Sequence, residues 1–152
     1  MGNDQKTLTC VLEFTEAFNE RNIEAALAQF AADGIVSRGD TQTLEGRDAV
    51  GKLLQGLVSG YPDCRLALRG MDAFGETAVC AEWWLCGTHE GRLDLPWGST
   101  SASASGRTVA LAFAALMFFD QGGKVERMEL RGNAAALLAE PATAPQANLQ
   151  PD

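Results

Sequence analysis

The stretch that decides the fold is Thr108–Phe119, which reads TVALAFAALMFF. It is followed by the turn signal Gln121-Gly122-Gly123 and then by the alternating segment Val125–Arg131. An apolar run bounded by turn residues predicts a buried strand, and the Gly-Gly pair predicts a hairpin into the next strand. Because the first run is apolar on both faces, we expect helices to cover one face and a second subunit to cover the other.

Two more extended segments precede this hairpin. Arg65–Arg69 alternates polar and apolar residues, which predicts a half-buried strand, and Thr77–His89 predicts a long strand. Ile35–Arg38 is expected to be a short first strand, and Gly39–Glu45 a polar loop after it. The Ser- and Gly-rich segment Gly98–Gly106 is expected to be a flexible loop.

Helical spacing dominates the first third of the chain. Apolar residues every three or four positions predict an amphipathic helix over Leu8–Glu20. Asn22 is a suitable N-cap for a second, short helix that extends to Phe30 and ends at Asp33-Gly34. A third helix is predicted over Arg47–Ser59, with a buried stripe of Val50, Leu53, Leu54 and Leu57. Helices followed by a run of antiparallel strands predict an α+β fold.

The length of 152 residues predicts one domain. We expect this domain to occupy residues 1–140 and to end in a short helix over Ala134–Glu140. The segment Pro141–Asp152 holds three of the five prolines and few apolar residues. It is therefore expected to be a disordered tail.

Charge and cysteine content exclude several classes of function. The 12 basic and 20 acidic residues give a net charge of −8, which argues against nucleic-acid or membrane partners. The chain shows no signal peptide and no apolar run long enough to span a membrane, so we expect a cytoplasmic protein. The four cysteines match no zinc spacing and are interpreted as reduced core thiols, and with one histidine no metal site is expected.

Several short segments stand in a distinctive order along the chain. They are Gly46–Val50, Tyr61–Asp63, Gly87–Gly91, Ser105–Val109, Gly123–Val125, and Asn133 before Leu137-Leu138. Together they resemble the SnoaL-like polyketide cyclases and ester cyclases of the NTF2-like superfamily. The resemblance runs from Leu8 to Leu138, which is nearly the whole chain.

This resemblance implies an NTF2-like (cystatin-like) cone. In such a fold a curved antiparallel sheet wraps around the N-terminal helices and leaves a pocket open at one end. It also implies homodimers through the outer face of the sheet. The activity it implies is cofactor-free closure of a carbon–carbon bond in polyketide esters, with a carboxylate as acid and base. Family members usually carry Asp at the position of Asn133.

The only histidine, His89, is a candidate acid or base. By strand alternation it shares a face with Trp83 and Leu85, at the pocket end of the long strand. A neutral imidazole can take up a proton near pH 7. The alternative is that His89 only hydrogen-bonds the turn between Gly87 and Gly91.

Glu129 is a second candidate, because one face of its strand carries Arg127, Glu129 and Arg131. A charged row of this kind is normally a solvated or dimer-facing surface. If the row instead faces the pocket, the two arginines keep Glu129 ionised. It would then be a base beside a cation that stabilises an oxyanion.

Two further carboxylates are candidates. Glu82 lies between Ala81 and Trp83, and burial there would raise its pKa into a range useful for proton transfer. The alternative is that Glu82 pairs with Arg69 across the sheet. Asp40, in the loop after the first strand, can reach the mouth of the pocket, although loop aspartates usually form turns.

Trp83, Trp97 and Phe118 are candidate contacts for an apolar substrate. Alternation places aromatic residues on both faces of the strands, so most of them are expected to belong to the core. Trp97 follows Pro96 in a loop. It is either a lid over a hydrophobic ligand or a surface anchor.

These observations predict a cofactor-independent enzyme that abstracts a proton next to the carbonyl of a small, largely apolar compound. Cyclisation or isomerisation would follow. The alternative is a non-catalytic NTF2-like domain that binds a hydrophobic ligand or serves for dimerisation. Asn133 in place of the usual carboxylate favours the alternative, whereas His89 and the scaffold favour the enzyme. A pocket lined only by apolar side chains would support the binding protein.

Overall fold

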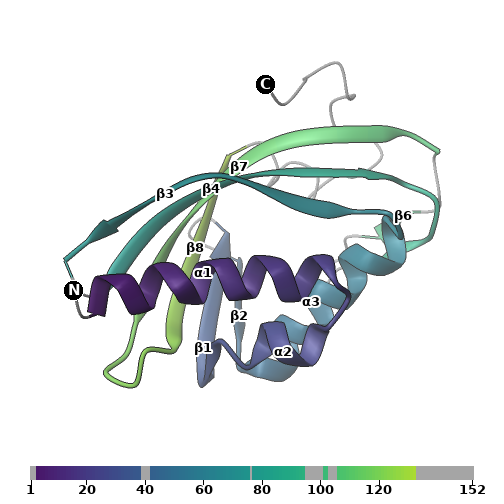
Figure 1. The fold of residues 1–152 in the computed structure, drawn as a ribbon. Helices are drawn as coiled ribbons and strands as arrows, with labels where there is room; N and C mark the ends of the chain where they lie inside the picture. Colours follow the sequence, from purple (N-terminus) through teal and green to yellow (C-terminus); the bar gives the residue numbers. More distant parts are fainter. Residues whose placement is uncertain (1–2, 39–41, 76, 95–100, 103–105, 133–152) are drawn as a thin grey trace.

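The computed structural model describes residues 3–38, 42–75, 77–94, 101–102 and 106–132. The expected helix Ala134–Glu140, the expected tail Pro141–Asp152, and the residues Trp97 and Asp40 lie outside this described part. Three helices in the described part lie together on one side of a curved sheet (Figure 1). They are α1 (Asn3–Asn19), α2 (Ile23–Leu27) and α3 (Arg47–Gly60). None of the described helices is long and apolar enough to cross a membrane.

The main sheet has six strands in the order β2-β1-β8-β7-β4-β3. Their bounds are Phe30–Arg38 (β1), Gln42–Glu45 (β2), Arg65–Phe74 (β3), Ala78–Thr88 (β4), Thr108–Phe119 (β7) and Val125–Gly132 (β8). Two short strands, β5 (Leu93–Asp94) and β6 (Ser101–Ala102), pair with each other. The predicted α+β fold is confirmed. The predicted antiparallel sheet has one exception, because β1 and β8 pair in parallel.

The first two strands differ most from the sequence prediction. Phe30 and Asp33-Gly34, expected to end a helix, belong to β1. An irregularity in the pairing with β8 between Phe30 and Ile35 accommodates the Asp-Gly pair within the strand. Gln42–Glu45, expected to be loop, pairs with the end of β1 as β2. Pairing of the backbone with a neighbouring strand therefore overrides the local turn signals.

The inner face of the sheet carries the core. On β4 the residues Val79, Ala81, Trp83 and Leu85 are buried and alternate with more accessible residues, as the sequence predicts. The indole nitrogen of Trp83 donates a hydrogen bond to the hydroxyl of Thr15 on α1, at 2.9 Å. This bond satisfies the one polar atom of a tryptophan that is otherwise surrounded by apolar side chains.

Side chains also fix the helices to the sheet. Asn19, the last residue of α1, donates to the carbonyl of Leu66 and accepts from its backbone N–H, at 2.9 and 2.7 Å. Asn22 caps α2 by accepting from the backbone N–H of Ala25, as predicted. The guanidinium of Arg47, the first residue of α3, donates twice to the carbonyl of Phe30.

The C-terminal end of α3 lies directly against the chain that leaves β4. The backbone N–H groups of Glu90 and Gly91 both donate to the carbonyl of Gly60, at 3.1 Å. A side chain at Gly91 would collide with the carbonyl oxygen of Ser59. Glycine is therefore required here by close approach of two backbones.

We expect Gly91→Ala to lower the free energy of unfolding by about 1–3 kcal/mol, because the added methyl group overlaps the Ser59 carbonyl. Urea denaturation measures the loss. Gly70→Ala is the matched control, because nothing lies within 4 Å of a Cβ placed there, and it should change stability by less than about 0.5 kcal/mol. Equal effects of the two substitutions would contradict the close approach.

We expect Leu54→Ala to cost about 2–5 kcal/mol, because Leu54 is buried in the stripe of α3. The exposed Gln55 on the same helix is the control, and Gln55→Ala should be nearly neutral. Thermal and chemical denaturation of the two variants give the comparison. A loss below about 0.5 kcal/mol for Leu54→Ala would show that the stripe does not pack as described.

Candidate functional site

An apolar cavity lies between the helices and the inner face of the sheet. Its volume is about 60 Å³. One water needs about 10–15 Å³, so the cavity is more than a packing defect. Its aromatic wall consists of Phe14, Phe18, Phe30 and Phe113.

Helix α3 supplies one wall of the cavity. All four residues of the stripe predicted from helical spacing line it, namely Val50, Leu53, Leu54 and Leu57. The opposite wall comes from strand residues that alternate onto the inner face, including Val36, Leu85, Met128 and Leu130. The periodicity of the sequence thus directs both sets of side chains into one space.

The described wall exposes only apolar atoms to this space. Arg131 is the one charged residue of the lining, and its guanidinium is engaged elsewhere, by the Glu129 carboxylate and the Leu130 carbonyl, each at 3.2 Å. Arg131 therefore contributes no polar atom to the wall.

Arg38 is a neighbour of lining residues, although it does not itself line the cavity, and it was not named as a candidate in the sequence. It pairs in register with Leu130 and shares the inner face of β1 with Val36, and both of these residues line the cavity. Burial lowers the pKa of the Arg38 guanidinium below its ordinary value. Strand alternation within Ile35–Arg38 could have identified Arg38, because it places positions 36 and 38 on the same face.

His89 is buried and continues the inward-facing series of β4, as alternation predicts. Its ring stacks on the ring of Tyr61, with the centroids 5.1 Å apart and an interplanar angle of 20°. Its backbone N–H donates to the Arg107 carbonyl, and its carbonyl accepts from Gly106. Burial raises the pKa of Tyr61 to about 12, so this phenol stays protonated near neutral pH. Neither ring lines the cavity.

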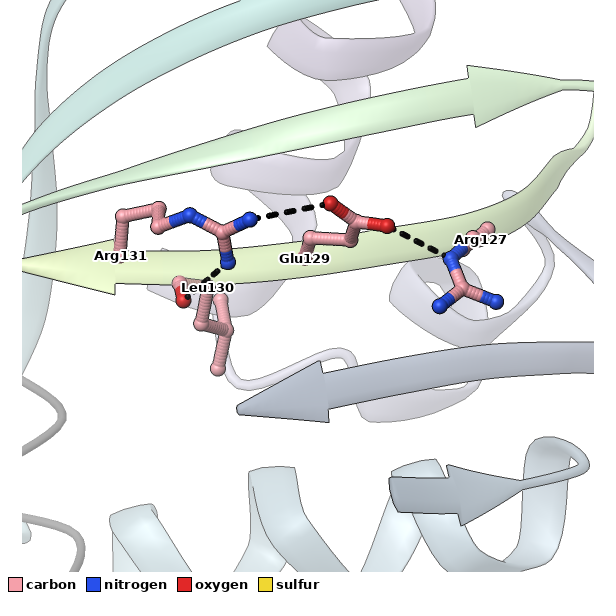
Figure 2. Close-up of polar contacts among 4 residues, drawn as sticks. All are labelled: Arg127, Glu129, Leu130 and Arg131. Atoms are coloured by element: carbon pink, nitrogen blue, oxygen red, sulfur yellow. Dashed lines mark hydrogen bonds and ion pairs between the residues drawn. The ribbon is translucent and has the colours of Figure 1, made fainter. Parts of the chain in front are cut away.

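Glu129 lies on the outer face of the sheet, between Arg127 and Arg131 (Figure 2). The register settles the face, because Glu129 pairs with Leu116 whereas the neighbouring Met128 pairs with the buried Met117. The hydrogen bond from Arg127 Nε, at 2.7 Å, lowers the pKa of the Glu129 carboxyl. The arginines thus favour ionised Glu129, but the interpretation that turns this row into the pocket is wrong.

Glu82 is exposed on the outer face, so the expectation of a buried carboxylate with a raised pKa is wrong. It pairs in register with Gly70 on β3 and with Ala114 on β7. Arg69, its proposed partner, places its guanidinium 5.3 Å from the centre of the Trp84 ring.

Two of the aromatic candidates lie on opposite faces of the sheet. Trp83 is fully buried and stacks on Phe113, with the ring centroids 5.1 Å apart. It therefore packs against a residue of the cavity wall without lining the cavity itself. Phe118 pairs in register with Ala78 and Arg127 and lies on the outer face, away from the cavity. The other two proposed contacts, Trp97 and Asp40, are not in the described part.

The thiols are not activated as nucleophiles. Burial raises the pKa of Cys10 and Cys64 to about 11, so both stay protonated. Cys80 and Cys86 are only half-buried and lie on the outer face, which corrects their interpretation as core thiols. Among the described residues no three His, Cys, Asp or Glu side chains gather where they could hold a metal ion.

Several proteins of known structure are similar to this chain. The chain is similar to a candidate polyketide cyclase from Xanthomonas campestris pv. campestris, with 26% identity, a TM-score of 0.73, and coverage of 91% of this chain and 98% of the other. A candidate SnoaL-like polyketide cyclase from a Jannaschia species gives 14% identity, a TM-score of 0.78, and coverage of 95% and 97%.

An NTF2-like protein of unknown function from Burkholderia pseudomallei gives 20% identity, a TM-score of 0.67, and coverage of 88% and 97%. No significant match was found among curated proteins. Residues 11–128 match the family described as SnoaL-like domain. The chain therefore belongs to the SnoaL-like domain family.

Proposed function

We propose that this SnoaL-like protein binds a small apolar molecule in the cavity between α3 and the inner face of the sheet. The observation that carries the proposal is the wall itself, which exposes only apolar atoms among the described residues. Apolar burial is then the main source of affinity. The cavity volume of about 60 Å³ admits a small group of the ligand rather than a large molecule as a whole.

The candidate acids and bases lie away from this space. Proton abstraction needs a base within about 2.6–3.2 Å of the proton's donor atom, or one water away. Glu82 and Glu129 lie on the opposite face of the sheet, and His89 stacks on Tyr61 outside the lining. This placement supports a binding role over an acid–base role.

The second candidate is a cofactor-independent cyclase or isomerase that acts on a polyketide-like carbonyl compound. The 26% identity to the candidate polyketide cyclase from Xanthomonas favours it. The reaction needs an ionisable group at the cavity, and the described wall supplies no base. We therefore rank it below ligand binding.

We also propose that two copies associate through the outer face of the sheet. This face carries half-buried apolar residues on neighbouring strands, including Trp84, Leu116 and Phe118, and no described helix covers it (Figure 1). Exposed apolar patches of this kind mark interaction sites. Glu82 and Arg131 flank Ala114 from opposite sides, so a two-fold axis along β7 places Glu82 of one copy opposite Arg131 of the other.

We expect the neutral fluorophore N-phenyl-1-naphthylamine to bind saturably, with enhanced emission, and Leu57→Trp to weaken its binding at least tenfold. Leu57 lines the cavity, so the larger side chain occupies the space that the probe needs. Leu12→Trp is the matched control, because Leu12 is 48% exposed on α1 and does not line the cavity. Fluorescence titration measures both dissociation constants.

Unchanged binding to Leu57→Trp would place the probe outside the cavity and contradict the proposal. Turnover of a polyketide ester without added cofactor, lost in Leu57→Trp but kept in Leu12→Trp, would establish the second candidate instead. Mass spectrometry of the products detects such turnover.

For the association of two copies, we expect light scattering at micromolar concentration to give twice the mass of one chain. Leu116→Lys should give the mass of a single chain, because it places a charge in the centre of the apolar face. Its cross-strand neighbour is Glu129, so the lysine is tolerated within the sheet. Leu12→Lys on α1 is the control and should not change the mass. A single-chain mass for the unmodified protein would refute the dimer.

A further inference from the structure

We infer that the part of the ligand that enters the cavity is a hydrocarbon group without a hydrogen-bonding atom, such as the edge of an aromatic ring or a short branched alkyl group. This inference rests on the proposed function, since it names the class of molecule that the same cavity selects. It differs from what the family resemblance implies, because a polyketide ester carries carbonyl groups at short intervals.

In the described part of the chain, the backbone at lining residues of α3 and of the central ladders is hydrogen-bonded within secondary structure. On α3 the lining residues lie within the helix, where N–H groups after the first turn bond to carbonyls of the preceding turn. On the sheet, Leu85 and Phe113 lie in the paired ladder of β4 and β7, and Met128 lies between β7 and β1. The backbone N–H and C=O groups of these residues therefore bond within secondary structure.

The polar atoms of Trp83, Thr15 and Arg131 are also directed elsewhere. The indole N–H of Trp83 donates to Thr15, and the Thr15 hydroxyl donates to the carbonyl of Val11, at 2.8 Å. The guanidinium of Arg131 is held by Glu129 and the Leu130 carbonyl, as described above. A carbonyl oxygen placed among the phenylalanines would lose its bonds to water and gain none.

The size of the cavity limits the group further. Its volume is about 60 Å³, less than half that of an engineered cavity of about 150 Å³ that stays dry and binds benzene. Only the edge of one ring or a short branched chain is therefore expected to enter it.

The test compares indane with 1-indanone, which have nearly the same shape and differ by one carbonyl oxygen. We expect calorimetry to give a dissociation constant for 1-indanone about 10- to 100-fold weaker than for indane, because the oxygen is left unpaired. Leu57→Trp should weaken both ligands. Val36→Thr adds a hydroxyl donor to the wall at nearly constant volume and should narrow the difference by about tenfold.

Binding of 1-indanone as tight as or tighter than that of indane would show that a donor reaches the ligand. That result would overturn the inference and leave the proposed binding function intact. Failure of both compounds to bind, together with failure of the neutral fluorophore, would overturn the proposed function itself. Circular dichroism checks that Val36→Thr is folded. The comparison of indane with 1-indanone in the unmodified protein does not depend on that variant.

Discussion

The hydrogen bond from the Trp83 indole to the Thr15 hydroxyl fixes strand β4 of the sheet against the first helix. It joins residues 68 positions apart and lies inside an otherwise apolar core. Because an unpaired buried N–H is costly, it restricts how α1 can slide or rotate over β4. Trp83 also stacks on Phe113 of β7, so the position of β7 is restricted as well. Phe113 in turn forms part of the cavity wall.

The two faces of the sheet consequently meet different environments. The inner face buries its side chains against α1 and α3 and leaves one apolar space that they do not fill. The outer face presents alanines, Leu116 and Phe118 beside the charged row of β8. Since charges are expensive to bury without partners, the row at Glu129 lies on the outer face, and the wall formed by the described residues has no carboxylate. This division favours a ligand-binding function over proton transfer.

Sequence reasoning located the candidate site only in part. The stripe of α3 and the inward direction of His89 followed from periodicity, and both agree with the structure. Which face of β8 is the inner one did not follow, because its alternating pattern is compatible with either orientation until the register with β7 is known. Glu82 was uncertain for a similar reason, since its burial depends on whether a helix covers that face.

The sequence by itself determined the order of the three described helices and of the long strands, the α+β fold class and the family. Helical and extended spacing are local properties that each segment carries alone. The tertiary structure decided that β1 pairs in parallel with β8, that residues 42–45 form a strand, and that the cavity is apolar. These features arise from contacts between segments distant in the sequence. Their backbone hydrogen bonds and buried area outweigh local preferences such as the turn signal at Asp33-Gly34.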